Sequence, residues 1–228
     1  MAETKFHIRE ECQNPTDGDF ILAAFDSSLP HLAANGSGDQ WGSTPFSERP
    51  ESRERMYGAI SLSEASRLSQ EASEQGRLFI AEVEADDRSD LQGLSVRSDD
   101  NGTRFLSVGA AGVRDKWWAA YLKAHDSTKA IYEDEMADGK FCYVEVLISD
   151  FRTGAARKGA GAALLQRAKA YAVLRGARAL YLDCWAGNGG SLINFYTAQG
   201  FVKVADFEVE KPDSSVWPGS LLKLDLES

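Results

Sequence analysis

The clearest pattern of hydrophobic and polar positions begins at residue 141. Residues 141–148 form an almost unbroken apolar and aromatic run, which predicts a buried strand. Residues 159–174 repeat apolar side chains at helical spacing, and Gly176 stands where such a helix would end. The predicted order is strand, helix, strand, helix, strand and strand, over residues 141–148, 159–174, 179–185, 190–199, 201–209 and 221–226.

The first 140 residues show a weaker pattern. We expect strands over residues 6–9, 79–83 and 105–113, the last of them after a hairpin turn at Asn101-Gly102. We expect helices over residues 18–34 and 62–75, with Asp17 and Ser61 as N-caps and Pro30 as a kink or break. Residues 35–53 are predicted to be a loop, and residues 116–139 a partly helical insertion.

Composition narrows the class of protein. The chain has 228 residues, a length typical of one domain, and 43% of them are hydrophobic. Lys and Arg number 25 and Asp and Glu 35, so the net charge is −10. That charge disfavours nucleic acid and anionic membranes as partners and mildly favours a cationic substrate, although solubility alone is the commoner reason for it.

The cysteines and the apolar runs indicate in which cellular compartment the protein is expected. The three cysteines, Cys12, Cys142 and Cys184, have a spacing that matches neither a disulfide framework nor a zinc ligand set. No apolar run approaches the ~20 residues that cross a bilayer, and the first residues lack the layout of a signal peptide. We therefore expect a cytoplasmic protein without a metal site.

A glycine-rich segment joins a predicted strand to a predicted helix at residues 156–165 (ARKGAGAALL). The first turn of a helix leaves N–H groups unpaired and carries a partial positive charge. Gly159 and Gly161 let a phosphate approach that backbone, and Arg157 and Lys158 add charge. The segment is therefore a candidate pyrophosphate site, and its other interpretation is a tight turn whose glycines serve packing alone.

Two other phosphate-binding motifs fit this segment less well. It is not a Walker A loop, because no Lys-Ser or Lys-Thr follows Gly161. A dinucleotide fingerprint fits better, since Asp183 lies at about the ~20-residue offset of a ribose-binding acid. However, Leu164 occupies the place of its third glycine. An enzyme that binds NAD or S-adenosylmethionine through the Gly159/Gly161 turn therefore stays open as an alternative.

A second motif follows at residues 185–201 (WAGNGGSLINFYTAQGF). A glycine-rich loop, then a strand, an Asn-containing loop and a helix that ends in Tyr-x-x-x-Gly-Phe resembles the GNAT superfamily of N-acetyltransferases. The resemblance covers residues 141–210 and implies a single domain over residues 1–228. Its fold would be mixed α/β, with helices flanking a central, mostly antiparallel sheet in which the parallel strands 141–149 and 179–185 splay apart.

The resemblance also implies a cofactor, acetyl-CoA, and the residues that hold it. Its pantetheine arm would pair with backbone groups of Leu147, Ile148 and Ser149, as an added strand does. Its pyrophosphate would meet the N–H groups of Arg157, Lys158, Gly159, Ala160, Gly161 and Ala162. Asn188 would contact it from the next loop. Family members usually carry Arg or Gln where this chain has Ala156, and Arg157 is the residue that would substitute.

Direct acetyl transfer to an amine needs a proton acceptor for the amine and a proton donor for the leaving thiolate. Tyr196, four residues before Gly200, matches the family tyrosine that faces the coenzyme sulfur, and we expect it to be the general acid. Glu145 is the candidate general base, because its apolar neighbours would raise its pKa toward neutrality. Its other interpretation is a strand acid that faces solvent or pairs with a lysine.

The function that these observations favour is transfer of an acetyl group from acetyl-CoA to a primary amine of a small molecule or peptide. A GNAT-fold module that binds acyl-CoA without turnover is a further alternative. We expect no nucleic-acid or membrane partner, and a homodimer is one assembly that the resemblance allows. Trp41, Trp117 and Trp118 are candidates for either an acceptor pocket or the core.

Overall fold

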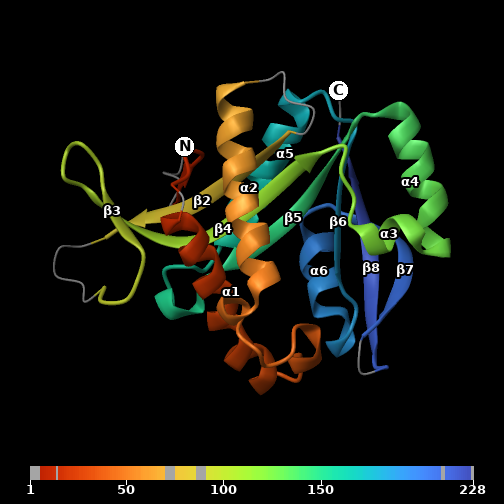
Figure 1. The fold of residues 1–228 in the computed structure, drawn as a ribbon, viewed down its shortest axis with the longest axis horizontal. Helices are drawn as coiled ribbons and strands as arrows, with labels where there is room; N and C mark the ends of the chain where they lie inside the picture. Colours follow the sequence, from red (N-terminus) through yellow and green to blue (C-terminus); the bar gives the residue numbers. More distant parts are fainter. Residues whose placement is uncertain (1–5, 14, 70–74, 86–90, 212–213, 227–228) are drawn as a thin grey trace. The chain divides into compact units, whose positions relative to one another are not determined.

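The computed structural model describes residues 6–13, 15–69, 75–85, 91–211 and 214–226. Its strands form a mixed sheet in the order β1-β2-β4-β5-β6-β8-β7, with β3 paired to β4 (Figure 1). The strands are β1 (His7–Arg9), β2 (Gly76–Glu84), β3 (Val96–Ser98), β4 (Arg104–Asp115), β5 (Phe141–Ser149), β6 (Ala179–Trp185), β7 (Val202–Glu210) and β8 (Val216–Asp225). The parallel pair is β5 with β6, and the pairs β1–β2, β3–β4, β6–β8 and β7–β8 are antiparallel. The predicted fold class is confirmed.

The helices flank this sheet. They are α1 (Thr16–Ala34), α2 (Pro50–Leu68), α3 (Ala120–Ala124), α4 (Asp126–Asp138), α5 (Ala160–Leu174) and α6 (Ser191–Ala198). None of the helices in the described ranges is long and apolar enough to span a bilayer. The chain divides into two compact units: unit 1 holds residues 1–31, 43–112 and 146–167, and unit 2 holds residues 32–42, 113–145 and 168–228.

In unit 1, α2 packs against β2 through small polar residues. The backbone N–H groups of Gly76 and Leu78 donate to the hydroxyl oxygens of Ser66 (3.1 Å) and Ser63 (2.9 Å). Met56 and Ile60 of the same helix are fully buried. The serines satisfy backbone donors that would otherwise be buried without a partner, so a helix with few apolar residues still packs closely on the strand.

A buried carboxylate links three parts of unit 1. Glu82 of β2 is fully buried, and its oxygens lie 2.9 Å from Nε of Arg9 and 2.7 Å from an N–H nitrogen of Arg97. Arg9 also pairs with Asp17 of α1, at 2.7 Å. These ion pairs link β1, β3 and the start of α1 to the C-terminal part of β2.

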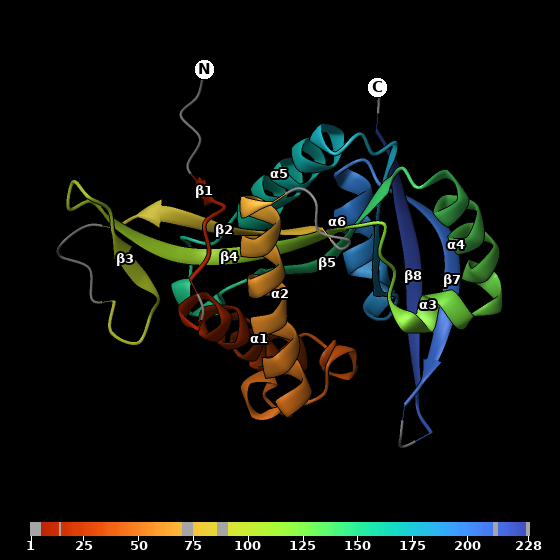
Figure 2. The same ribbon diagram turned by 45° about the horizontal axis from the view of Figure 1, so that its top comes forward.

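In unit 2, α3 and α4 cover one face of β6, β8 and β7, and α6 lies on the other face (Figure 2). The core on the α3–α4 side is aromatic, and its fully buried rings are Trp118, Phe141, Tyr143 and Tyr181. The start of α4 also covers the open edge of β7: the Ser127 hydroxyl donates to the carbonyl of Asp206 (2.6 Å), and the Glu208 N–H donates to Nε2 of His125 (3.4 Å). This edge is thereby partly blocked against pairing with another chain.

The second predicted helix was wrong in position. It was expected over residues 62–75, but α2 begins at Pro50 and ends at Leu68, and residues 70–74 lie outside the described part. Pro50 favours the first turn of a helix because its missing N–H needs no partner there. The apolar stripe of α2 is narrow and partly made of buried serines, so hydrophobic periodicity alone did not reveal it.

Three smaller expectations were also wrong. Asp17 lies inside α1 rather than capping it, because its carboxylate accepts from Arg9 and from the N–H of Gln13 (2.6 Å). Pro30 does not break α1, which continues to Ala34, so a break at this residue was wrong. Finally, β8 begins at Val216, so Trp217, Pro218 and Gly219 belong to the strand. Pro218 is tolerated there because its carbonyl, which accepts from Ala186 (2.9 Å), is the group that bonds.

We predict that Glu82→Gln lowers the free energy of unfolding by about 3 kcal/mol, because it leaves Arg9 and Arg97 without their buried counter-charge. Urea unfolding of the purified variant measures the change. Glu84→Gln, two residues along on the exposed end of β2, is the control and should change stability by no more than about 0.5 kcal/mol. Equal stability of the two variants would contradict a structural role for the Glu82 ion pairs.

Candidate active site

The glycine-rich loop of unit 1 follows β5 and leads into α5. The N–H groups of Lys158, Ala160 and Ala163 donate to the carbonyls of Ala155, Arg157 and Gly159. Within the described residues, the N–H groups of Gly159, Gly161 and Ala162 donate to no acceptor. The loop therefore presents several unpaired donors at the positive end of a helix, which is what an anion-binding site requires.

Two further features of this loop fit an anion. Gly159 has φ of +94°, a conformation that favours glycine, and it holds the turn into α5. The guanidinium of Arg157 lies 3.6 Å from the ring centroid of Phe151, and its buried Nε has no hydrogen-bond partner in the described chain. Burial lowers the pKa of Arg157, although the Asp150 carboxylate opposes the shift. A phosphate oxygen would satisfy this donor and restore the charge balance.

β5, the strand before the loop, is longer than the segment that pairs with β6. The β5–β6 ladder joins Phe141 to Ala179, Cys142 to Leu180 and Tyr143 to Tyr181, and β5 then runs on to Ser149. Leu147 and Ser149 are half-buried and Ile148 is buried. On the β4 side, a Cβ added at Gly109 would lie 2.8 Å from the carbonyl oxygen of Ile148, so β4 approaches this part of β5 closely.

In unit 2, Tyr196 projects from α6 into the core. It is 8% exposed, and its ring packs edge-on against Phe195 and Phe201, with centroids 5.1 and 6.1 Å away. Its hydroxyl makes no hydrogen bond to any described residue. Burial raises the pKa of Tyr196, and the nearby Cys184 and Asp183 add to the shift. The hydroxyl thus keeps its proton, and no neighbour within the described chain takes up that proton.

Glu145 lies near the end of the β5 segment that belongs to unit 2. It is half-buried, and its carboxylate lies 3.9 Å from the guanidinium of Arg114. Arg114 in turn lies over the ring of Trp117, 4.7 Å from its centroid. The partner of this acid is therefore an arginine from β4, whereas the sequence suggested a lysine as its structural partner.

The sequence did not identify Asp183 as part of an aromatic site. The hydroxyls of Tyr143 and Tyr121 both donate to its carboxylate, the latter at 2.9 Å. The sequence pattern suggests a role for Asp183 only as a ribose-binding acid of a dinucleotide motif. Its position as a single acid within a strand of buried residues was the available signal, but its tyrosine partners come from β5 and α3, far away in the chain.

Asn188 has local partners of its own. Its backbone adopts φ of +49°, and its amide NH₂ donates to the carbonyl of Asn35 (3.1 Å) and the hydroxyl of Ser37 (2.7 Å). These bonds hold the loop after β6 against residues 35–37 of the same unit. Contact between Asn188 and a cofactor stays a prediction, and in this conformation the NH₂ group is already engaged.

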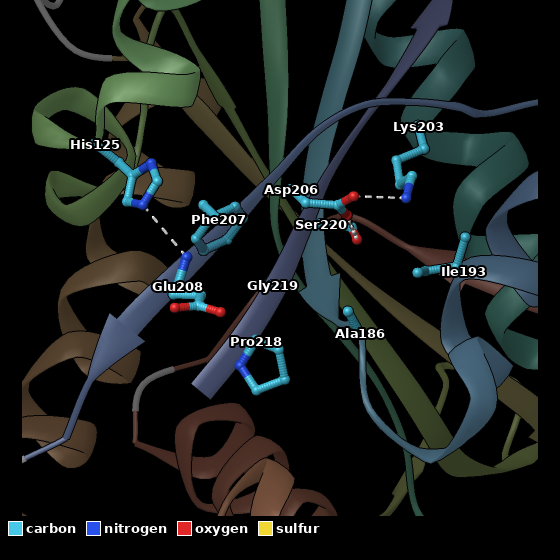
Figure 3. A pocket seen from close by; sticks show the side chains of 10 residues that line it. All are labelled: His125, Ala186, Ile193, Lys203, Asp206, Phe207, Glu208, Pro218, Gly219 and Ser220. Carbon is cyan, nitrogen blue, oxygen red and sulfur yellow. Dashed lines mark hydrogen bonds and ion pairs between the residues drawn. The ribbon is translucent and has the colours of Figure 1, made fainter. Parts of the chain in front are cut away.

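A pocket of about 550 Å³ opens on unit 2 around β7 and β8 (Figure 3). Its polar lining includes His125, Lys203, Asp206 and Glu208. Lys203 and Asp206 form an ion pair at 2.7 Å, and Ser220 donates to the same carboxylate (2.5 Å). Among the described residues, no cluster of His, Cys, Asp and Glu could hold a metal ion.

A family model described as the acetyltransferase (GNAT) family matches residues 57–201. The chain belongs to this family. Members of the GNAT family use acetyl-CoA, so acetyl-CoA is the cofactor of this protein. The unpaired N–H groups of Gly159, Gly161 and Ala162 and the orphaned Nε of Arg157 fit its phosphates.

Several solved GNAT-fold structures resemble the whole chain. An N-acetyltransferase from Staphylococcus aureus Mu50 is 15% identical with a TM-score of 0.54, and the match covers 98% of this chain and 100% of that one. The protein yncA from Salmonella typhimurium, solved with its cofactor acetyl-CoA, is 16% identical with a TM-score of 0.54 over 99% and 96%. A GCN5-related N-acetyltransferase from Kribbella flavida is 15% identical with a TM-score of 0.51 over 97% and 98%. Such low identity shows the fold alone, and none of the curated proteins matches the chain significantly.

We predict that Gly161→Glu abolishes acetyl-CoA binding by this GNAT protein while leaving it folded, because a carboxylate would enter the first turn of α5 beside the unpaired N–H groups. Calorimetric titration with CoA measures the loss, and circular dichroism checks the fold.

Gly58→Glu is the matched control for this variant. Gly58 lies on the exposed side of α2, where an added Cβ meets nothing within 4 Å, so CoA affinity should stay at the wild-type value. Wild-type affinity in Gly161→Glu would place the phosphate site elsewhere.

Proposed function

We propose that this GNAT protein transfers the acetyl group of acetyl-CoA to a primary amine of a small molecule or peptide by direct attack, without a covalent acyl-enzyme. The observation that carries the proposal is Tyr196, a buried tyrosine of α6 whose hydroxyl has no hydrogen-bond partner in the described chain. Because no described residue engages this hydroxyl, it is available to donate its proton to a bound group, which supports a role in proton transfer.

The residues that would bind the cofactor lie mainly at the end of β5 and the start of α5. The backbone of Leu147, Ile148 and Ser149 would pair with the pantetheine amides. The pyrophosphate would be held by the loop of residues 157–162, which consists of Arg157, Lys158, Gly159, Ala160, Gly161 and Ala162. When bound, acetyl-CoA supplies the thioester whose carbonyl carbon the amine attacks.

Tyr196 would hold the proton that the departing sulfur needs. Because burial and the neighbouring Cys184 and Asp183 raise its pKa, the hydroxyl stays protonated at neutral pH and can act as an acid. The raised pKa keeps the proton on the hydroxyl until the thiolate forms, although it also makes the hydroxyl a weaker acid.

Glu145 would accept the proton that the amine releases, directly or through a water molecule. Its carboxylate lies at the end of the unit 2 part of β5 and is half-buried, and one of its oxygens lies 3.9 Å from the guanidinium of Arg114. The same ion pair favours the second candidate, a GNAT module that binds acyl-CoA without turnover, in which Glu145 is a structural partner of Arg114.

We also propose a cytoplasmic location. Cys12, Cys142 and Cys184 are all buried as free thiols, which supports folding in a reducing compartment.

We predict that Tyr196→Phe lowers kcat by roughly tenfold or more and leaves the affinity for CoA unchanged, because only the hydroxyl is removed. Thiol release from acetyl-CoA, measured with a panel of primary amines, gives the rates. Tyr57→Phe is the control, since that hydroxyl lies at the surface of α2 and bonds to Asp19 at 2.6 Å. Equal turnover in Tyr196→Phe and Tyr57→Phe would show that Tyr196 is not the general acid. If the wild-type protein binds CoA but acetylates no amine of the panel, the alternative of a GNAT module that binds acyl-CoA without turnover is favoured.

A further inference from the structure

The pocket of Figure 3 is built from unit 2 alone and contains neither Tyr196 nor any residue of the phosphate loop. Its volume of about 550 Å³ lies within the range of roughly 300–1,000 Å³ that is typical of small-molecule sites. Its floor is the β7–β8 ladder, in which Asp206 pairs with Ser220 and Glu208 pairs with Pro218. A molecule in this pocket contacts two strands and also α6.

The acids of the pocket point away from the aromatic core of unit 2. Phe207 is 3% exposed and belongs to the core on the α3–α4 side. Because side chains alternate along a strand, its neighbours Asp206 and Glu208 lie on the other face of β7, which is the face of α6. Both acids are exposed, so a solute reaches them directly.

The backbone of these two acids is fixed at the edge of β7. The Ser127 hydroxyl donates to the carbonyl of Asp206 at 2.6 Å, and the N–H of Glu208 donates to Nε2 of His125 at 3.4 Å. Both contacts come from the start of α4, where His125 is the N-cap. A carboxylate on a fixed backbone loses less freedom when it engages a ligand, so this part of the pocket is preorganised.

Only one of the two carboxylates has a counter-charge among the residues that the structure describes. Lys203 lies 2.7 Å from Asp206, and the Ser220 hydroxyl donates to the same carboxylate at 2.5 Å. These hydrogen bonds lower the pKa of Asp206, which keeps it ionised. The Glu208 carboxylate makes no hydrogen bond or ion pair to any described residue, since only its backbone N–H is bonded. The pocket therefore has one negative charge left over, at Glu208.

Apolar groups complete the lining of the pocket. Ile193 comes from α6, Ala186 follows β6, and Pro218 lies opposite Glu208 in the ladder. All three are half-buried, so each has apolar surface that a ligand can cover. A ligand that fits this lining combines one positive charge with a compact apolar body.

We propose that this pocket is a binding site for a small organic cation, a primary ammonium group on a compact apolar body. Glu208 pairs with the ammonium group, and Ile193, Ala186 and Pro218 contact the body. The Lys203–Asp206 ion pair repels a second positive charge, so the site favours monocations. The proposal assigns binding alone to the pocket and does not rest on the proposed function.

The first test is an NMR titration of the isotope-labelled full chain without cofactor. The probes are cyclohexylmethylammonium and neutral cyclohexylmethanol, which share a body and differ in charge. We expect the cation to bind about fivefold more tightly, which is the most that an exposed ion pair usually contributes. It should shift the amide signals of Glu208, Gly219 and Ser220. Equal affinities, or shifts confined to residues outside the pocket, would overturn the proposal.

Glu208→Gln should remove the preference for the cation and keep the fold, because its side chain is exposed and bonds to no described residue. Glu210→Gln is the matched control: it removes the same charge two residues along on the same face of β7, at an exposed position outside the pocket lining. This control should keep the wild-type preference. A preference that survives in Glu208→Gln, or one that is lost equally in both variants, would contradict the assignment to Glu208.

A variant on α6 tests the apolar wall separately from the charge. Ile193→Ala should weaken the binding of both probes by a similar factor and so leave the preference for the cation unchanged. Val204→Ala, at an exposed position of β7 outside the lining, is the control and should bind both probes as the wild type does. Wild-type affinities in Ile193→Ala would overturn the placement of the apolar body against α6.

Discussion

The parallel ladder between β5 and β6 sets the geometry on which the candidate site residues of unit 2 depend. It joins only three residue pairs and ends at Tyr143 and Tyr181, while both strands continue. Because side chains alternate along a strand, Glu145 lies on the same face as Tyr143, and Asp183 on the same face as Tyr181. A slip of one residue in this register would turn Asp183 away from Tyr143 and Tyr121. The opposite face of β6 carries Cys184, which lies near Tyr196.

Local arrangement also explains how an acidic chain can bind a phosphorylated cofactor. The net charge of −10 repels anions at long range, but this field is screened within about 10 Å at ordinary ionic strength. The unpaired N–H groups at the start of α5 would act on a phosphate at contact distance, where screening is weak. The same net charge favours the approach of a cationic group, such as the ammonium form of the proposed amine acceptor.

Much of the cofactor half was predictable from the sequence because its signals are local. The strand and helix boundaries from Phe141 to Ala198 follow from apolar runs that glycines interrupt, and β6 was predicted residue for residue. The candidate phosphate loop lies within ten residues of chain, 156–165. By contrast, α2 was misplaced because its packing depends on serines that bond to β2. The partners of Asp183 were out of reach, since Tyr143 and Tyr121 lie 40 and 62 residues away along the chain. Contacts of that kind depend on the fold, which the sequence pattern shows only in outline.

The most direct test of acetyl-CoA as the cofactor is thermal unfolding of the purified protein with acetyl-CoA, CoA, NAD or S-adenosylmethionine, each added separately. A ligand at about one hundred times its Kd stabilises the folded state by about 2.7 kcal/mol, which raises Tm by several degrees. We expect a shift with acetyl-CoA and CoA and none with the other two. A shift with NAD or S-adenosylmethionine alone would contradict it and would reassign the Gly159/Gly161 turn to a different cofactor.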